Sequence, residues 1–161
     1  MRAGGRRAPS VICLAVWAVT MLGACSRPPA VAKGLSSDAL DAAIGPAIGD
    51  PSTCVLLADP ASGRIVYTYG QLFNCVRPLP ACDRPGTLTA NTALALARAQ
   101  GGRDASCASN PDGSRTVGWA AGRTQGTRRN LLYSAVMEGQ RALPGEEMTA
   151  RLQGAFQQAG V

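Results

Sequence analysis

The stretch TCVLLADPASGRIVYTY, residues 53–69, has the clearest secondary-structure pattern in the sequence. Apolar, β-branched and aromatic side chains predominate in its two arms, TCVLLA (residues 53–58) and RIVYTY (residues 64–69). Between the arms stand Asp59, Pro60 and Gly63, whose residue types favour a tight turn. Two such arms around a short turn predict an antiparallel β-hairpin.

A helix is expected on each side of this hairpin. Before it, Ser36 or Ser37 can cap a helix, whose apolar residues recur at helical spacing: Leu40, Ala43, Ile44, Ala47 and Ile48. After it, an alanine-rich segment predicts a helix from about Thr87 to Gln100, ended by Gly101 and Gly102. Thr87 is expected to act as the N-cap of that helix.

Two further strands and a closing helix complete the pattern. RTVGWAAGR, residues 115–123, alternates as a half-buried strand does, whereas NLLYSAVME, residues 130–138, is more continuously apolar and so more central. Residues 103–114 are expected to form a loop with room for one short strand. Pro144 opens the last helix, which carries the apolar stripe Met148, Leu152, Ala155, Phe156 and Ala159.

The order of these elements predicts an α+β fold. A single antiparallel sheet of four to five strands, with the helices packed on it, buries every apolar face economically. No internal repeat or low-complexity tract interrupts the sequence.

The first 25 residues indicate export. Arg2, Arg6 and Arg7 precede the apolar run VICLAVWAVTMLGA, residues 11–24, which is shorter than the roughly 20 residues of a membrane span. This layout is typical of a signal peptide. Leu22–Cys25 also resembles the bacterial lipobox, so residues 1–24 are expected to be removed and Cys25 lipidated.

The resulting lipoprotein has a simple predicted organisation. Residues 25–35 form a proline-bearing tether anchored in the membrane, and residues 36–161 form a single α+β domain on the periplasmic face of the cell envelope. Ser26 after the lipidated cysteine favours the outer membrane. After cleavage, 13 basic residues oppose 10 acidic ones, and the arginines are not interleaved with aromatic residues. A nucleic-acid partner is therefore not expected.

Four cysteines remain in the domain after Cys13 is removed and Cys25 is lipidated. An even number in an exported chain predicts disulfides. We expect a Cys75–Cys82 bond around the proline-stiffened loop VRPLPA, which leaves Cys54 to pair with Cys107. Since the chain has no histidine and no Cys-Xaa-Xaa-Cys, no metal site is expected, and no cofactor is predicted.

Several segments resemble the serine β-lactamases and penicillin-binding proteins, class D enzymes in particular. CVLLADPASGRIVYTYGQ is similar to their opening hairpin, and NCVRPLPACDRPGTLTANTALALA is similar to the approach to their catalytic helix. RTVGWAAGRTQGTRRNLLYSAVMEG resembles their paired C-terminal strands. The resemblance implies a truncated α/β core, because the family's helical subdomain has no room between Gln100 and Ser114.

The family's catalytic residues are missing from this sequence. Thr87, Leu88, Thr89 and Ala90 stand where the family has Ser-Xaa-Xaa-Lys, and Lys33, the only lysine, lies in the tether. Ser-Xaa-Asn and Lys-Thr-Gly are absent, with Arg115–Val117 a distant echo of the latter. Acylation by a hydroxyl needs an adjacent base, so no catalytic residue is assigned and enzymatic activity is not expected.

Three function hypotheses follow. The first is a non-catalytic envelope lipoprotein, a degenerate relative of the penicillin-recognising fold that binds another envelope protein or peptidoglycan. The second is a partner-binding domain of the profilin-like or roadblock-like kind, which the same element order suits. The third is a weak hydrolase that uses Thr87 and an unrecognised base.

Overall fold

The computed structural model describes Met1, residues 34–126 and residues 129–161. Its centre is a five-stranded antiparallel sheet in the order β2-β1-β7-β6-β5. The strands are β1 (Cys54–Ala58), β2 (Ile65–Gly70), β5 (Arg103–Ala108), β6 (Thr116–Arg123) and β7 (Leu132–Gly139). A two-stranded sheet joins β3 (Leu79–Pro80) to β4 (Thr87–Leu88). The predicted α+β class and the predicted hairpin are confirmed.

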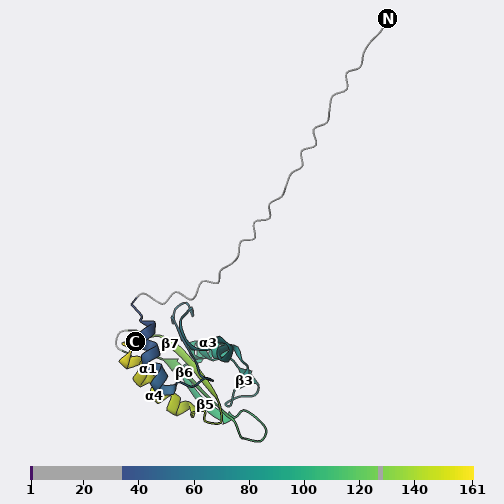
Figure 1. The fold of residues 1–161 in the computed structure, drawn as a ribbon, viewed down its shortest axis with the longest axis vertical. Coiled ribbons are helices and arrows are strands. Elements are labelled where there is room, and N and C mark those ends of the chain that lie inside the picture. Colours follow the sequence, from purple (N-terminus) through teal and green to yellow (C-terminus); the bar gives the residue numbers. More distant parts are fainter. Residues whose placement is uncertain (2–33, 127–128) are drawn as a thin grey trace.

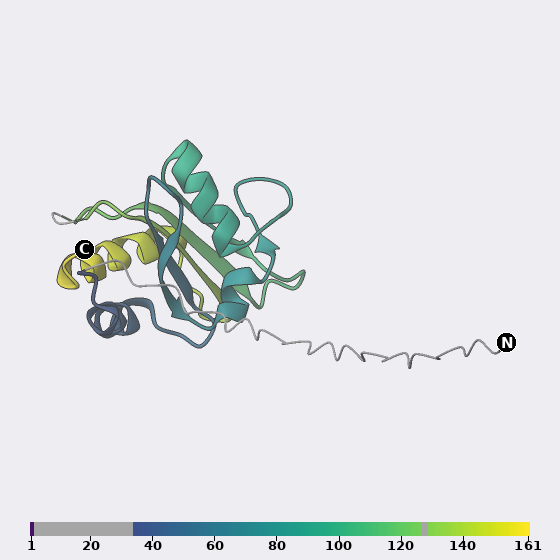
Figure 2. The same ribbon diagram turned by 90° about the horizontal axis from the view of Figure 1, so that it is seen from above.

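Helices cover both faces of the large sheet (Figures 1 and 2). The helices α1 (Ser37–Ile48) and α4 (Gly145–Gln158) pack on one face, and α3 (Ala90–Gln100) packs on the other beside the short α2 (Leu72–Val76). The first core contains Leu40, Ile44, Val55, Leu152 and Phe156. The second contains Leu56, Leu94, Trp119, Leu132 and Val136.

The central strands are buried on both sides. The prediction that β7 is central is confirmed, since it lies between β1 and β6. The prediction that β6 is half-buried is wrong: Val117 to Gly122 are all buried, because α3 covers one face and α4 the other. The packing of α4 is so close that a Cβ on Gly145 would lie 2.3 Å from the Trp119 carbonyl oxygen. A Cβ on Gly118 of β6 would likewise lie 2.0 Å from the Leu143 carbonyl oxygen, so this small residue reflects close packing and is no sign of exposure.

The start of α3 differs from the sequence prediction. The helix begins at Ala90, and its N-cap is Thr89, whose hydroxyl accepts a hydrogen bond from the Thr92 amide at 3.2 Å. Thr87 is not the cap, because it lies in β4 and pairs with Pro80. The first helix is capped by Ser36, one of the two expected serines.

Two disulfides are present, but the expected pairing is wrong. The bonds are Cys54–Cys75 and Cys82–Cys107. Cys54 and Cys107 lie on strands separated by β7 and β6, a distance of about 14 Å at the usual strand spacing, whereas bridged Cα atoms lie within about 7 Å. Cys75 instead sits on α2 above the start of β1, and Cys82 faces the edge strand β5.

Several predictions concern residues outside the part of the chain that the structure describes. The signal peptide of residues 1–24, the lipidation site Cys25 and the tether up to Lys33 are among them, so they stay predictions. Within the part of the chain that the structure describes, no helix is long and apolar enough to span a bilayer.

Candidate functional site

The N-terminus of α3 is where the sequence resemblance would place a nucleophile. Here the hydroxyls of Thr89 and Thr92 lie 3.0 Å apart and bond to each other, while Thr89 also caps the helix. The Ala90 carbonyl accepts a hydrogen bond from the buried Ser134 hydroxyl at 2.8 Å. The two hydroxyls at the start of α3 thus bond to each other and cap the helix. The first turn of α3 contains no lysine or histidine.

The carboxylate that precedes this helix is also engaged. Asp83 is ion-paired with Arg103 and Arg84. Burial raises its pKa, but the hydrogen bond from Arg84 and the positive charge of Arg103 outweigh burial and hold the pKa below its ordinary value. A carboxylate with a lowered pKa is a weaker base, so Asp83 is poorly suited to activate a threonine hydroxyl.

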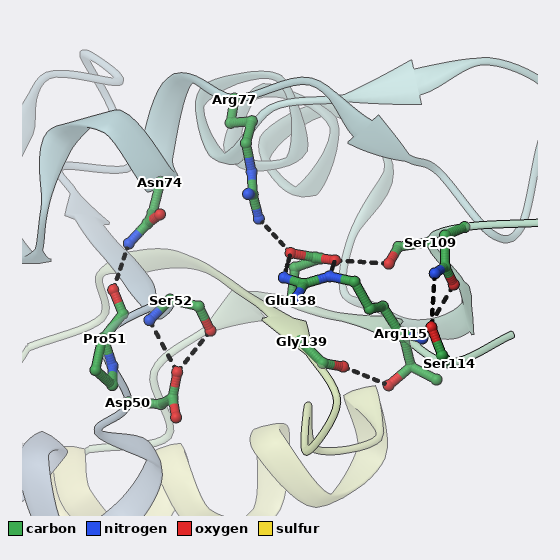
Figure 3. Close-up of polar contacts among 12 residues, drawn as sticks. Asp50, Pro51, Ser52, Asn74, Arg77, Ser109, Ser114, Arg115, Glu138 and Gly139 are labelled. Atoms are coloured by element: carbon green, nitrogen blue, oxygen red, sulfur yellow. Dashed lines mark hydrogen bonds and ion pairs between the residues drawn. The ribbon is translucent and has the colours of Figure 1, made fainter.

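A second polar cluster lies at the end of the sheet where β1 begins and β7 ends (Figure 3). Its centre is Glu138 on β7, which is only 4% exposed. Arg77, which follows α2, reaches Glu138 at 2.7 Å. Arg115, just before β6, donates from Nε and Nη2 to the two carboxylate oxygens, both at 2.7 Å. The Ser109 hydroxyl donates a further bond at 2.7 Å.

These contacts fix the charge of Glu138. The hydrogen bond from Arg115 is the main cause that lowers its pKa, and Ser109 and Arg77 add to it against the opposing effect of burial. The resulting pKa is about 2, so Glu138 stays ionised at neutral pH. Such a carboxylate is an anchor for two arginines, and it is unsuited to proton transfer.

A hollow of about 560 Å³ borders the cluster, and several of its polar groups are engaged in hydrogen bonds. Asp50 accepts hydrogen bonds from the amide and hydroxyl of Ser52 at 2.8 and 2.7 Å. The Asn74 side chain donates to the Pro51 carbonyl at 2.8 Å. The arrangement ties α2, the β5–β6 connection and the end of β7 together.

Beside the cluster, α2 presents an apolar surface to solvent. Leu72 is 67% exposed, Phe73 64% and Val76 48%. Arg77 links this surface to the cluster, since its guanidinium lies 5.9 Å from the centre of the Phe73 ring. We call Leu72, Phe73, Val76 and Arg77 the α2 patch.

Contacts on the buried side of α2 hold the α2 patch in place. Cys75, in the middle of the helix, is fully buried and bonded to Cys54 at the start of β1. The Asn74–Pro51 hydrogen bond and the Arg77–Glu138 ion pair secure both sides of the helix. The fold thus buries one side of α2 through a cystine and an asparagine while it keeps the large apolar side chains outside.

Sequence reasoning missed both the α2 patch and the Glu138 cluster. α2 is only five residues long and shows no helical period in the sequence. A charged residue at the end of the continuously apolar β7 was the one available signal for Glu138. Of the residues singled out in advance, Arg115 belongs to the cluster, whereas Thr87 lies apart from it in β4.

No metal centre is indicated in the described ranges, which hold no group of three or more histidine, cysteine, aspartate or glutamate side chains placed to bind an ion. Comparisons of the chain with family models, with curated proteins and with solved structures found no match. The proposal for function therefore rests on the geometry of the site.

Proposed function

We propose that the chain is a lipid-anchored, non-catalytic binding module of the bacterial cell envelope that holds an envelope protein on the α2 patch. The observation that carries the proposal is the exposure of Leu72, Phe73 and Val76 at 67%, 64% and 48%. Clustered exposed apolar side chains mark interaction surfaces more often than isolated ones. Interface cores also favour aromatic residues and arginine, which the patch has in Phe73 and Arg77.

The rigidity of the patch favours binding. A partner that docks on α2 need not order it, because the Cys54–Cys75 bond and the Arg77–Glu138 pair already do so. Preorganisation of this kind lowers the entropic cost of association. A protein surface suits the patch better than peptidoglycan, since the patch offers three apolar side chains and its one charged group is already paired.

The hydrolase hypothesis has less support. The hydroxyls of Thr89 and Thr92 are bonded to each other, the Thr87 hydroxyl lies on β4, and Asp83 is bound to two arginines. A threonine hydroxyl without a base is a poor nucleophile. We therefore assign no catalytic residue.

The proposed ancestry is a reduced penicillin-recognising fold. It is supported by the hairpin β1–β2 before α3, the antiparallel strands β5 to β7 and the closing helix α4. The same order suits the profilin-like and roadblock-like alternative, and both ancestries lead to a binding module. Envelope localisation with an anchor at Cys25, on the outer membrane, is proposed from the N-terminal sequence; two disulfides are compatible with an extracytoplasmic protein.

Affinity capture from detergent-solubilised membranes tests the proposal. The Leu72→Ser/Phe73→Ser variant should lose a co-purifying protein that the wild type retains, because both changes remove apolar area from the patch. The matched control is Ala42→Ser/Gln157→Ser, two serine changes at exposed positions of α1 and α4, which should retain it. Equal capture by all three proteins would contradict the proposal. Labelling of this protein itself by a fluorescent penicillin in the same membranes would favour the hydrolase hypothesis instead.

A further inference from the structure

A groove of about 560 Å³ lies between α3 and the β1–β2 hairpin, at the other end of the sheet from the α2 patch. Its apolar lining includes Ile65 on β2, Leu94 on α3 and Leu132 on β7. Its volume is within the range of small-molecule sites, and such sites combine an apolar lining with few polar groups. The shape and chemistry suit a hydrocarbon chain.

Arg98, near the end of α3, is the only charged residue that lines this groove. The Arg98 Nη2 donates to the Ala61 carbonyl. The Arg98 Nη1 lies close to Gly63, since a Cβ added to that glycine would be 2.9 Å from it. Among the ion pairs of the described residues, none involves Arg98. The groove therefore offers an unneutralised cation beside an apolar floor. That pairing complements a ligand with an anionic head and an apolar tail.

The position of the groove indicates where such a ligand comes from. Gly34 lies against Arg129 in the β6–β7 connection, and that connection and the β1–β2 turn are at the same end of the sheet, since Leu132 pairs with Ala58. Figure 1 shows that the start of α1 and the β1–β2 turn both lie toward the upper end of the domain. Residues 25–33 span about 30 Å when extended, so an anchor at Cys25 keeps this end near the bilayer.

We propose that the groove takes an acyl chain of an anionic membrane phospholipid, with its phosphate on Arg98. Arginine binds phosphate through paired, charge-assisted hydrogen bonds. The inference rests on the membrane anchoring within the proposed function. A lipid bound in the groove would orient the domain with Arg98 toward the membrane and the α2 patch away from the membrane. A partner on α2 would then be held at a distance from the bilayer.

Photo-crosslinking of the mature lipidated protein in vesicles tests this assignment. The two probes are phosphatidylglycerol and diacylglycerol that carry the same diazirine-bearing acyl chain, and adducts are mapped by peptide mass spectrometry. Phosphatidylglycerol should label the peptides around Ile65 and Leu94 roughly tenfold more than diacylglycerol, which has no phosphate; this is the ratio expected when one charge-assisted hydrogen bond is lost. Arg98→Gln should abolish that preference, and Arg141→Gln, another exposed arginine, should not.

A variant with a filled groove provides a second test in the same crosslinking experiment. Ala95→Trp, at an exposed position in the groove lining, should reduce labelling by both probes. Equal labelling by phosphatidylglycerol and diacylglycerol, or adducts spread over other surfaces, would overturn the assignment of a phospholipid to the groove. Membrane retention is measured in the same samples: its loss would show that the anchoring has failed, whereas retention without groove adducts would refute the groove alone.

Discussion

The Glu138 carboxylate receives both hydrogen bonds of the Arg115 guanidinium fork, each at 2.7 Å. One partner ends β7 and the other precedes β6, so the pair fastens the strand end to the β5–β6 connection. Arg77 binds the same carboxylate from α2. Glu138 thus supports the base of the α2 patch without being part of its exposed surface.

Glu138 should make stability depend on pH in the acidic range. Its pKa is about 2 in the folded protein against an ordinary value of 4.5, and a lowered pKa contributes stability that is complete above the unfolded value. We expect a loss of roughly 3 kcal/mol as the pH falls from about 5 to about 2. Denaturant unfolding at a series of pH values measures it.

Glu138→Gln should remove that acid-dependent component and destabilise the protein at neutral pH, because two arginines lose their carboxylate. The control is Glu147→Gln, which breaks the exposed Glu147–Arg151 pair and should cost less than about 1 kcal/mol. A Glu138→Gln variant with the wild-type pH profile would contradict the role given to this cluster.

The disulfides should be mapped as Cys54–Cys75 and Cys82–Cys107 in the purified protein. Mass spectrometry of non-reduced peptides identifies the pairs directly. Cys54→Ser/Cys75→Ser should lower the free energy of unfolding by about 3 kcal/mol, since the bond closes a long loop of the unfolded chain. Recovery of a Cys75–Cys82 peptide would refute this connectivity.

Thr89, as the N-cap of α3, should matter for stability and not for turnover. Thr89→Ala should cost about 1 kcal/mol of unfolding free energy, whereas Thr87→Ala, at an exposed position of β4, should stay within about 0.5 kcal/mol. Neither threonine should form an adduct with a penicillin. A covalent adduct on either, detected by mass spectrometry, would disprove the non-catalytic assignment.

Cys25 is expected to carry the membrane anchor. Cys25→Ser should either release the protein from membranes or leave it as an unprocessed precursor, because a lipobox without cysteine cannot be lipidated. Fractionation and gel mobility distinguish the two products. Unchanged size together with normal membrane retention would rule out the lipoprotein assignment.

Strong local patterns allowed much of the fold to be predicted. The β1–β2 hairpin has turn residues between two apolar arms, and α4 has an apolar stripe at helical spacing, so both were found close to their true bounds. The start of α3 was misplaced by three residues, because Thr87 and Thr89 are equally plausible caps until the pairing of β3 with β4 is known.

Long-range arrangement explains what the sequence did not reveal. The cystine pairing depends on strand order, which places β5 and β1 three strands apart. Glu138 and Arg77 are separated by 61 residues, and only the sheet brings them together. The α2 patch was missed since exposure of Leu72 and Phe73 follows from the bond that holds Cys75 inward.

Binding of a protein partner to the α2 patch is tested most directly by photo-crosslinking in living cells, with a photoreactive phenylalanine analogue in place of Phe73. The analogue preserves the exposed aromatic side chain, and the same analogue at exposed Gln157 on α4 is the control. A partner on the α2 patch should give one discrete crosslinked protein from position 73 that is absent from position 157 and is lost when Leu72→Ser and Val76→Ser are added. No adduct at position 73, or the same adducts from both positions, would contradict it.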